Sequence, residues 1–373
     1  MVGGGVMGCS MAYHLAKRGL DVLLLERATL ASGSTSKNAG GVRQQFSAEI
    51  NVRIQMLAVR MLLDFEEEIG VTSDFRQNGY LFLLTRPQEV LDFHALVEMW
   101  HRVGLAEAQW LSADDARRLV PAVNVEDVLG CTFCPTDGIA SPDAVTMGYA
   151  SAARRLGTRI REGVGVTGID VGGGRVSGLR TTAGDISTRV LFDCAGPWAE
   201  EIGRLAGVQV PVKPYRRHIF VTDAFPAIPR ATPFTIDFAN SFYFHPEGEG
   251  LLFGMSDKDE PSTFSTEVDQ LFTEKVVEAA LGRVPALETA RIRTAWAGLY
   301  EVTPDHQAIL GPADGVEGFW CACGFSGHGF MQAPAAGFLL SQLLVDGRAD
   351  IDLAPLSLSR FARGESLTEQ NVI

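Results

Sequence analysis

The stretch Val2-Gly3-Gly4-Gly5-Val6-Met7-Gly8 opens the chain and matches the pattern G-x-G-x-x-G at Gly3, Gly5 and Gly8. A helix-like run follows over residues 9–18, and the apolar run 22–25 ends on Glu26. In a βαβ dinucleotide-binding unit the first glycine permits a tight turn, the second lets the backbone approach a pyrophosphate, and the third lets helix and strand pack closely. We therefore predict a dinucleotide site with its pyrophosphate at the helix N-terminus. A tight turn without a ligand is the alternative.

The acid Glu26 stands where such units bind a ribose hydroxyl, and its charge argues against NADP, whose 2′-phosphate it would repel. Only Met1 and Val2 precede the first glycine, whereas a buried strand usually has about five residues. We therefore expect that the natural chain starts upstream of Met1.

Length and charge bound the possible functions. With 373 residues the chain exceeds the ~250–300 residues of a single core, so we expect two domains. The net charge of −13 argues against nucleic acid as a partner, because phosphate binding needs a basic surface.

The cysteines indicate neither a metal site nor a disulfide framework. The chain has six, and only Cys131 and Cys134 form a C-x-x-C pair. A structural zinc site would need a second such pair or histidines at ligand spacing. We therefore predict no metal, buried free thiols and a reducing compartment, the cytoplasm.

Two apolar regions resemble membrane segments, but neither has the right pattern. The charged pair Lys17 and Arg18 follows the N-terminal apolar stretch, whereas in a signal peptide it would precede it. The region 319–345 is interrupted by polar residues and by Pro334, so it does not predict a transmembrane helix.

The loop over residues 32–46 is dense in small and hydroxyl-bearing residues. Such residues can direct many N–H and O–H donors at a phosphate or a flavin ring. Within the loop, Arg43 can hold a carboxylate through two parallel hydrogen bonds. A flexible surface loop is the alternative.

Periodicity and turn signals place the remaining elements. We expect helices over residues 48–69, 88–103, 113–120, 142–156, 199–206, 268–284 and 335–345, and strands over 79–84, 132–137, 159–166, 169–176, 190–194, 219–221, 242–245 and 251–254. The pattern predicts a nucleotide-binding α/β domain from residues 1–70, 140–206 and 296–373. An antiparallel-sheet α+β domain from residues 71–139 and 207–295 is interleaved with it.

Four motifs together resemble the FAD-dependent D-amino-acid oxidase and sarcosine oxidase superfamily. They are the 3–8 fingerprint with Glu26, Gly33-Ser34-Thr35, Cys194-Ala195-Gly196-Pro197-Trp198, and Gly324-Phe325-Ser326-Gly327-His328-Gly329. The resemblance runs from Val2 to about Val345 and implies a Rossmann-type FAD domain of the glutathione-reductase-like fold. Within the superfamily, residues 43–46, 77–81 and 135–138 look most like the β subunits of heteromeric sarcosine oxidase and dye-linked L-proline dehydrogenase.

The resemblance implies site residues. Substrate contacts would be Arg43, Tyr243, Tyr300 and His328, with Arg43 on the substrate carboxylate and the tyrosines beside the flavin. FAD contacts would be Gly3, Gly5, Val6, Met7, Gly8, Glu26, Arg27, Ser34, Thr35, Asn38, Ala39, Gly40, Gly41, Val164, Ala195, Gly196, Trp198, Gly327, His328, Gly329 and Met331. Each tyrosine could instead be a core aromatic, and His328 a hydrogen-bonded turn residue.

Three positions depart from relatives in the superfamily. Gly298 stands where monomeric sarcosine oxidases attach FAD through a cysteine, which implies non-covalent FAD. Met331 replaces a lysine that those enzymes use as a second carboxylate contact, so sarcosine itself is disfavoured. Pro142 stands where heteromeric sarcosine oxidases attach FMN through a histidine.

These features predict an FAD enzyme that oxidises the C–N bond of a small secondary amine or amino acid by hydride transfer to flavin N5. Oxygen, a quinone or a partner flavoprotein would accept the electrons, and an α subunit could complete the enzyme. Three alternatives stay open. The C-terminal residues 360–365 and 370–373 look like a mitochondrial FAD protein linked to complex I assembly, which would favour a non-catalytic flavoprotein. An FAD-dependent 2-hydroxy acid oxidase and an NAD-dependent dehydrogenase are the others.

Overall fold

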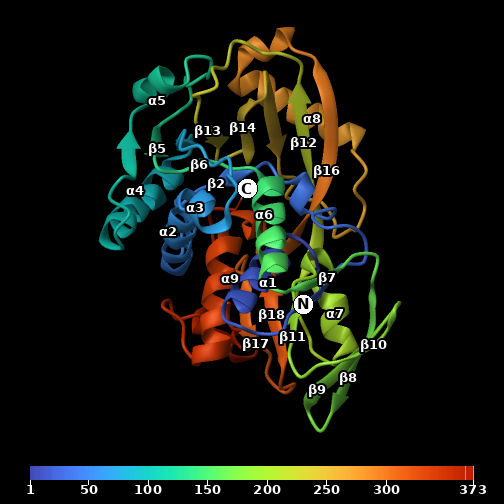
Figure 1. Cartoon of the computed structure of the whole chain (residues 1–373). Coiled ribbons are helices and arrows are strands. Elements are labelled where there is room, and N and C mark those ends of the chain that lie inside the picture. The colour runs from blue at the N-terminus through green and yellow to red at the C-terminus, as the bar shows by residue number, and fades with distance from the viewer. Residues whose placement is uncertain (366, 373) are drawn as a thin grey trace.

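Two sheets at different levels organise the molecule. A computed structural model describes residues 1–365 and 367–372. In Figure 1 a smaller sheet and the helices α1 and α9 occupy the lower half, α6 stands at mid-height, and a larger sheet fills the upper half. The chain passes several times between the two halves, as expected for interleaved domains.

The lower sheet is assembled around a single residue, Val2, which bridges in parallel to Leu25 and to Asp193. Val2 therefore joins the parallel pair β1–β7 to the pair β11–β18, and β17 runs antiparallel at the far edge of β18. The strands are β1 (Leu23–Leu25), β7 (Arg159–Arg161), β11 (Leu191–Asp193), β17 (Ile309–Pro312) and β18 (Phe319–Cys323). A largely parallel sheet of this kind is buried under helices on its faces.

Helix α1 (Val6–Lys17) packs between α6 (Pro142–Arg155) and α9 (Gly329–Asp346). All its residues from Val6 to Ala16 are buried, because helices lie against it on two sides. Small residues allow the close approach to α9. Ser10 Oγ donates to the carbonyl of Ala333 at 2.7 Å, and a Cβ at Gly337 would stand 2.3 Å from that Oγ.

Helix α9 starts six residues before the predicted start at residue 335, and it contains Pro334. The predicted start was therefore wrong. Pro334 removes only one intrahelical hydrogen bond, and the buried side chains of Phe330 and Met331 hold the first turn against the core. The extended helix brings its N-terminus to the Gly-rich turn at residues 324–328.

The larger sheet has eight strands in the order β16-β12-β15-β14-β13-β3-β5-β4. Its neighbours are antiparallel, except that β13 and β3 run parallel. These two strands come from different chain segments, so no hairpin fixes their direction. The bounds are β3 (Tyr80–Leu84), β4 (Gln109–Leu111), β5 (Gly130–Cys134), β12 (Lys213–Thr222), β13 (Phe234–Asp237), β14 (Phe242–Glu247), β15 (Gly250–Met255) and β16 (Ile292–Val302).

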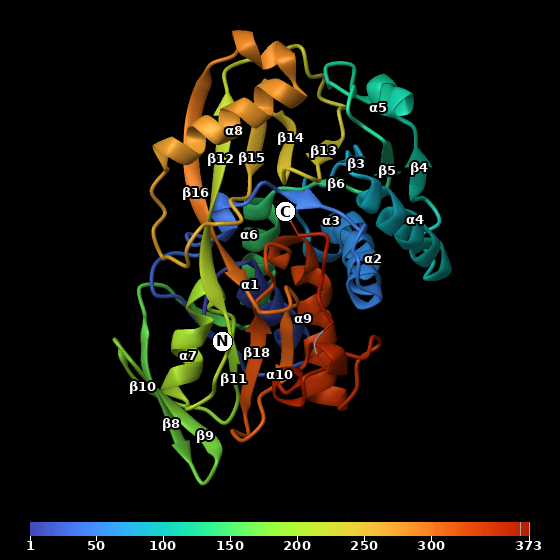
Figure 2. The ribbon, with the colours of Figure 1, turned by 180° about the vertical axis from the view of Figure 1, so that it is seen from behind.

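Helix α8 (Gln270–Arg283) covers one face of the larger sheet, and Figure 2 shows it crossing β12, β15 and β14. Phe272 and Val276 of α8 pack with Phe253 of β15 in one buried cluster. Side chains of the opposite face, among them Ile219, Ile236 and Tyr243, line a cavity that residues of the lower half also line. The domain boundary predicted at residue 296 lies inside β16, which pairs with β12 over its whole length.

The helix predicted over residues 48–69 is two helices, α2 (Glu49–Leu63) and α3 (Phe65–Ile69). Asp64, with φ −84° and ψ 2°, leaves the helical conformation between them, which lets Phe65 and Ile69 turn into the core. The other elements are α4 (Pro87–Arg102), α5 (Ala113–Leu119), α7 (Ala199–Leu205), α10 (Arg360–Arg363), β2 (Gly41–Val42), β6 (Gly138–Ile139), β8 (Val166–Gly172), β9 (Arg175–Thr181) and β10 (Gly184–Ser187), with 3₁₀ turns at Thr35–Lys37, Gly196–Trp198, Pro285–Thr289 and Ala354–Leu356.

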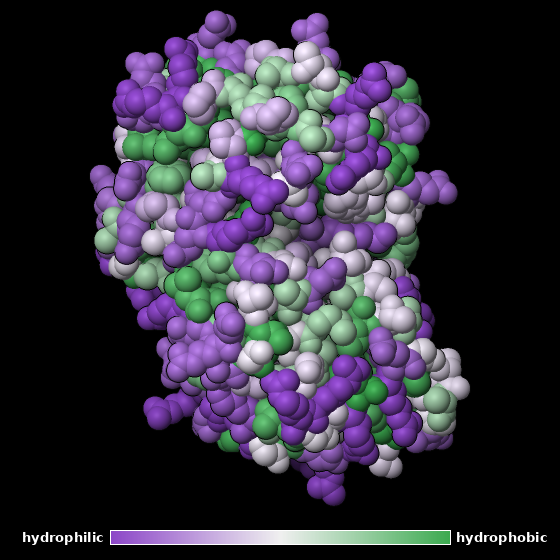
Figure 3. Space-filling model, turned by 45° about the horizontal axis from the view of Figure 1, so that its top comes forward, coloured by the Kyte–Doolittle hydropathy of each residue, from purple (hydrophilic) through white to green (hydrophobic). Residues whose placement is uncertain are grey.

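The surface carries hydrophobic residues interspersed among hydrophilic ones on the face shown in Figure 3. None of the helices within the described residues is both long and apolar enough to cross a membrane. The six cysteines are all free and buried, as predicted.

Candidate active site

A cavity of about 590 Å³ lies between the two halves and takes lining residues from both. It brings together residues from Val2 at one end of the chain to Met331 near the other. The predicted site residues that line it are Gly3, Gly5, Val6, Met7, Glu26, Arg27, Ser34, Thr35, Asn38, Ala39, Gly41, Arg43, Val164, Ala195, Gly196, Trp198, Tyr243, Tyr300, Gly327, His328, Gly329 and Met331.

Two of the predicted residues, Gly8 and Gly40, do not line the cavity. Gly8 serves the packing behind it, because a Cβ there would stand 1.9 Å from the carbonyl oxygen of Gly3. Gly40 has φ +73°, and a Cβ there would stand 2.5 Å from the carbonyl of Ala140. Both glycines therefore allow the backbones around the cavity to approach one another.

The turn that precedes α1 forms the lower wall. Gly3 has φ +106°, and a Cβ there would meet the carbonyl oxygen of Cys194 at 2.3 Å. Gly5 caps α1 without a side-chain hydrogen bond, and the Val6 N–H donates to Thr35 Oγ1 at 3.1 Å. The first amides of a helix have no partner within the helix. Those at the start of α1 therefore present N–H groups and the positive end of the helix dipole to the cavity.

Glu26 lies beyond this turn with its carboxylate fixed by the backbone. Its Oε2 accepts from the N–H of Gly4 at 2.7 Å, and its Oε1 accepts from the N–H of Ala28 at 2.8 Å. Each oxygen keeps a free lone pair for a hydroxyl donor. The Arg27 guanidinium stacks on the ring of Trp198 at 3.9 Å, and both side chains line the cavity.

At the other end of the cavity, Arg43 is buried, and its guanidinium donates hydrogen bonds to other groups of the protein. Its Nη1 donates to the carbonyl of Gln45 at 2.8 Å, and its Nη2 donates to the carbonyl of Asn371. The same Nη2 lies 3.1 Å from His328 Nε2. Because arginine can only donate, His328 Nε2 must accept, which places the ring proton on Nδ1. Burial, helped by the Arg43 charge, holds the pKa of His328 well below its usual value, so the ring is neutral.

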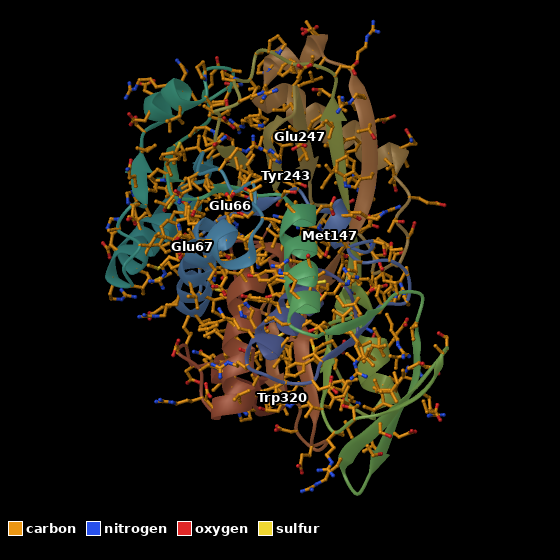
Figure 4. The ribbon with its side chains drawn as sticks, viewed as in Figure 1. Glu66, Glu67, Met147, Tyr243, Glu247 and Trp320 are labelled. Carbon is orange, nitrogen blue, oxygen red and sulfur yellow. The ribbon has the colours of Figure 1, made fainter. Side chains whose placement is uncertain are left out.

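The tyrosines come from the larger sheet. Tyr243, on β14, lies nearer the middle of the molecule than Glu247 at the end of the same strand (Figure 4). The ring of Tyr300, on β16, packs against Gly327, where a Cβ would stand 2.4 Å from it. Burial raises the pKa of both hydroxyls, so both stay protonated and can donate.

Sequence reasoning missed several lining residues of the larger sheet and its strand ends. Tyr80 and Phe234 stack at 4.3 Å between ring centroids, and Phe234 faces Tyr243 at 5.5 Å. Arg217 and Glu301 also line the cavity. Arg217 and Ile219 lie two residues apart on β12, and both line the cavity. Alternate residues of a strand face the same side, so this spacing could have indicated Arg217 once β12 was known to be a strand.

Glu301 lies beside the start of α9. Its Oε1 accepts weakly from the N–H of Phe325 at 3.4 Å, and its Oε2 is buried without a hydrogen-bond partner. Burial raises the pKa of Glu301 to about 7. A buried carboxyl oxygen with no protein partner indicates that a ligand group belongs next to it.

These features fit FAD. Two helix N-termini, those of α1 and α9, open onto one cavity, and a fixed carboxylate lies beyond the first of them. Gly5, Gly196 and Gly327 line the wall where side chains would fill space. The residues fit an extended dinucleotide: the start of α1 would hold its pyrophosphate, and Glu26 would accept a ribose hydroxyl.

Comparison with known proteins identifies the family. The family described as FAD dependent oxidoreductase, DAO, matches residues 1–343. The chain belongs to the DAO family. Mitochondrial sarcosine dehydrogenase of Mus musculus is 33% identical over 97% of this chain, and mitochondrial dimethylglycine dehydrogenase of Rattus norvegicus is 31% identical over 97%. This chain spans 41% and 44% of the lengths of those two relatives.

The solved structure of L-proline dehydrogenase from P. horikoshii is similar to this chain over nearly its full length. It has a TM-score of 0.92 and 32% identity, and the match covers 98% of each chain. The predicted fold, with a Rossmann-type FAD-binding unit interleaved with a sheet domain, and the predicted dependence on FAD are confirmed by these DAO-family relatives.

Proposed function

We propose that this protein is an FAD-dependent enzyme that oxidises the C–N bond of a small secondary amine or amino acid. One observation carries the proposal: a single cavity joins a dinucleotide cradle around α1 to a pocket containing Arg43, Tyr243 and Tyr300. The amine substrates named for the DAO-family relatives support the same class.

FAD would be held by the turn at residues 3–7, by Glu26 and Arg27, by the loop residues 34–41 that line the cavity, and by the start of α9. Gly298 offers no side chain for a covalent bond, which supports non-covalent binding. Bound FAD supplies the acceptor for the hydride that leaves the carbon next to the amine nitrogen.

The chain's own residues orient the substrate. Arg43 keeps part of its donor set for a carboxylate, although three of its contacts are to the protein. Tyr243 and Tyr300 donate from protonated hydroxyls and exclude water around the amine. His328 is neutral and accepts from Arg43, so it fixes that guanidinium and adds no second positive charge against an amine.

Partners and location belong to the same proposal. Oxygen, a quinone or a partner flavoprotein takes the electrons, and an α subunit completes the enzyme if the acceptor is a second flavin. The six buried free thiols support a reducing compartment, the cytoplasm.

The proposal is tested by the visible spectrum of the purified holoprotein under argon. L-Proline, sarcosine and a 2-hydroxy acid are added in turn. We expect an amine to bleach the flavin band, while the hydroxy acid leaves it unchanged. Bleaching by the hydroxy acid alone would overturn the amine assignment. A flavin that no compound reduces would favour a non-catalytic or partner-dependent flavoprotein.

A further inference from the structure

A second arginine, Arg217, faces the cavity from the larger sheet. It lies on β12 opposite Gly298 of β16, and its guanidinium stands 5.1 Å from the ring centroid of Tyr300. Because Gly298 has no side chain, the paired strand meets that guanidinium through the Tyr300 ring and not through the residue directly opposite. Arg217 therefore lies beside one of the proposed substrate tyrosines.

The guanidinium of Arg217 is mostly without protein partners. Its Nη1 donates to the carbonyl of Arg216 at 2.8 Å, and its Nε is buried without a hydrogen bond. No aspartate or glutamate among the described residues lies within the 4.0 Å that defines an ion pair with it. Arg217 is partly buried. A partly buried cation without a counter-charge is costly, and a carboxylate that accepts two parallel N–H bonds would relieve that cost.

On the other face of the strand, carboxylate side chains lie beside the neighbouring residue, Arg216. Arg216 pairs with Glu260 at 2.9 Å and with Asp269 at 3.3 Å. Successive side chains on a strand point to opposite faces, so those acids serve Arg216 and leave Arg217 to the cavity. The missing counter-charge of Arg217 therefore belongs to something that enters the cavity.

Arg43 differs in this respect, since its contacts to Gln45, Asn371 and His328 use three of its N–H bonds. Tyr300 lies within reach of both charges: burial raises the pKa of its hydroxyl, and the charges of Arg217 and Arg43 both oppose that rise. Two cations therefore flank one tyrosine in the substrate part of the cavity.

We propose that Arg217 binds a second carboxylate of the substrate, so that the preferred substrate is a secondary amine that carries two carboxylates, one for Arg43 and one for Arg217. This inference rests on the proposed function. Substrates of this class are amino acids whose nitrogen bears a carboxyalkyl group.

The test uses two thioethers in which sulfur replaces the amine nitrogen, so neither can undergo the proposed oxidation. Methylthioacetate has one carboxylate and 2,2′-thiodiacetate has two. Calorimetric titration of the holoprotein measures the dissociation constant of each. We expect thiodiacetate to bind at least tenfold more tightly. Arg217→Gln should abolish the difference, and Arg217→Lys should restore part of it.

Arg293→Gln is the matched control, because Arg293 is an exposed arginine of β16 outside the cavity lining. It removes the same charge and should keep the wild-type ratio. Equal affinities of the wild-type protein for the two thioethers would overturn the inference. So would an Arg217→Gln variant that shifts the flavin spectrum without ligand and keeps the wild-type ratio, since Arg217 would then contact the cofactor.

The two proposals fail separately. If no amine bleaches the flavin while thiodiacetate still binds through Arg217, the amine oxidation is wrong and the dicarboxylate site stands. If sarcosine bleaches the flavin and the ratio of affinities is one, the oxidation stands and the site is wrong.

Discussion

Arg43 Nη2 donates to the backbone carbonyl of Asn371, a residue 328 positions further along the chain. The segment around Asn371 is itself fixed, because the Glu369 carboxylate accepts from the backbone N–H groups of Ser47 and Ala48 and from Asn51 Nδ2. The C-terminal segment thus sets the position of the guanidinium that we propose as a carboxylate contact.

Arg43→Lys should lower kcat/KM for the amine that bleaches the flavin. Lysine keeps the charge but loses the planar set of donors that reaches Gln45, Asn371 and a carboxylate together. Loss of one charged hydrogen-bonded contact costs roughly 2–5 kcal/mol, or about 30- to 5,000-fold. Stopped-flow flavin reduction measures the effect. An unchanged kcat/KM would refute the role of Arg43.

Gly8→Ala should destabilise the protein and weaken FAD retention. The added Cβ would stand 1.9 Å from the Gly3 carbonyl, so the turn at the FAD cradle must move. Overpacking of this kind costs typically about 1–3 kcal/mol.

Gly282→Ala is the matched control, since Gly282 is in helix α8 with nothing within 4 Å of a Cβ. That change should stabilise by about 0.5–1 kcal/mol. Thermal unfolding and FAD release on dilution measure both variants; equal behaviour would contradict the packing role of Gly8.

Glu301 should make the protein less stable as pH rises. Burial raises its pKa in the folded protein to about 7, from about 4.5 for an exposed glutamate. The folded state therefore holds the proton more tightly, and its contribution is present below pH 4.5 and lost as pH rises through 7. Glu301→Gln should remove this pH dependence. The free energy of unfolding that depends on the Glu301 proton should change by roughly 1–3 kcal/mol over this pH range.

Denaturant unfolding of the holoprotein at a series of pH values measures the effect of Glu301→Gln. Asp137, whose pKa burial raises to about 6, titrates in both proteins, so the difference between them isolates Glu301. Parallel curves for the wild type and the variant would show that Glu301 does not titrate there.

Arg360→Leu should strongly destabilise the C-terminal region. The Arg360 guanidinium binds Asp305 through two hydrogen bonds of 2.8 and 2.9 Å, and the two side chains are 1% and 2% exposed. Removal of one partner from a buried pair costs about 3–5 kcal/mol. Arg363→Leu is the control, because its pair with Glu365 is exposed and worth about 0–1 kcal/mol. Similar losses in thermal unfolding for both variants would be inconsistent with this difference in burial.

The parts of the site that sequence could predict depend on short stretches. The glycines at 3, 5 and 8 and the acid at 26 have fixed spacings, so they could be recognised together. Arg217 and Glu301 are isolated residues whose relation to the cavity depends on the register of β12 with β16, which no local pattern reveals. The direction of β13 against β3 and the start of α9 at Gly329 were missed for the same reason: tertiary packing decides both.

The wall of the cavity begins at Val2 and is completed only at Met331. A ribosome releases these residues in that order, so the glycine turn emerges early and meets the rest of the wall only when the start of α9 has emerged. The complete wall can therefore form only after the chain up to Met331 has been synthesised. Nascent chains that end before α9 should therefore lack a complete FAD cradle, whatever the supply of FAD.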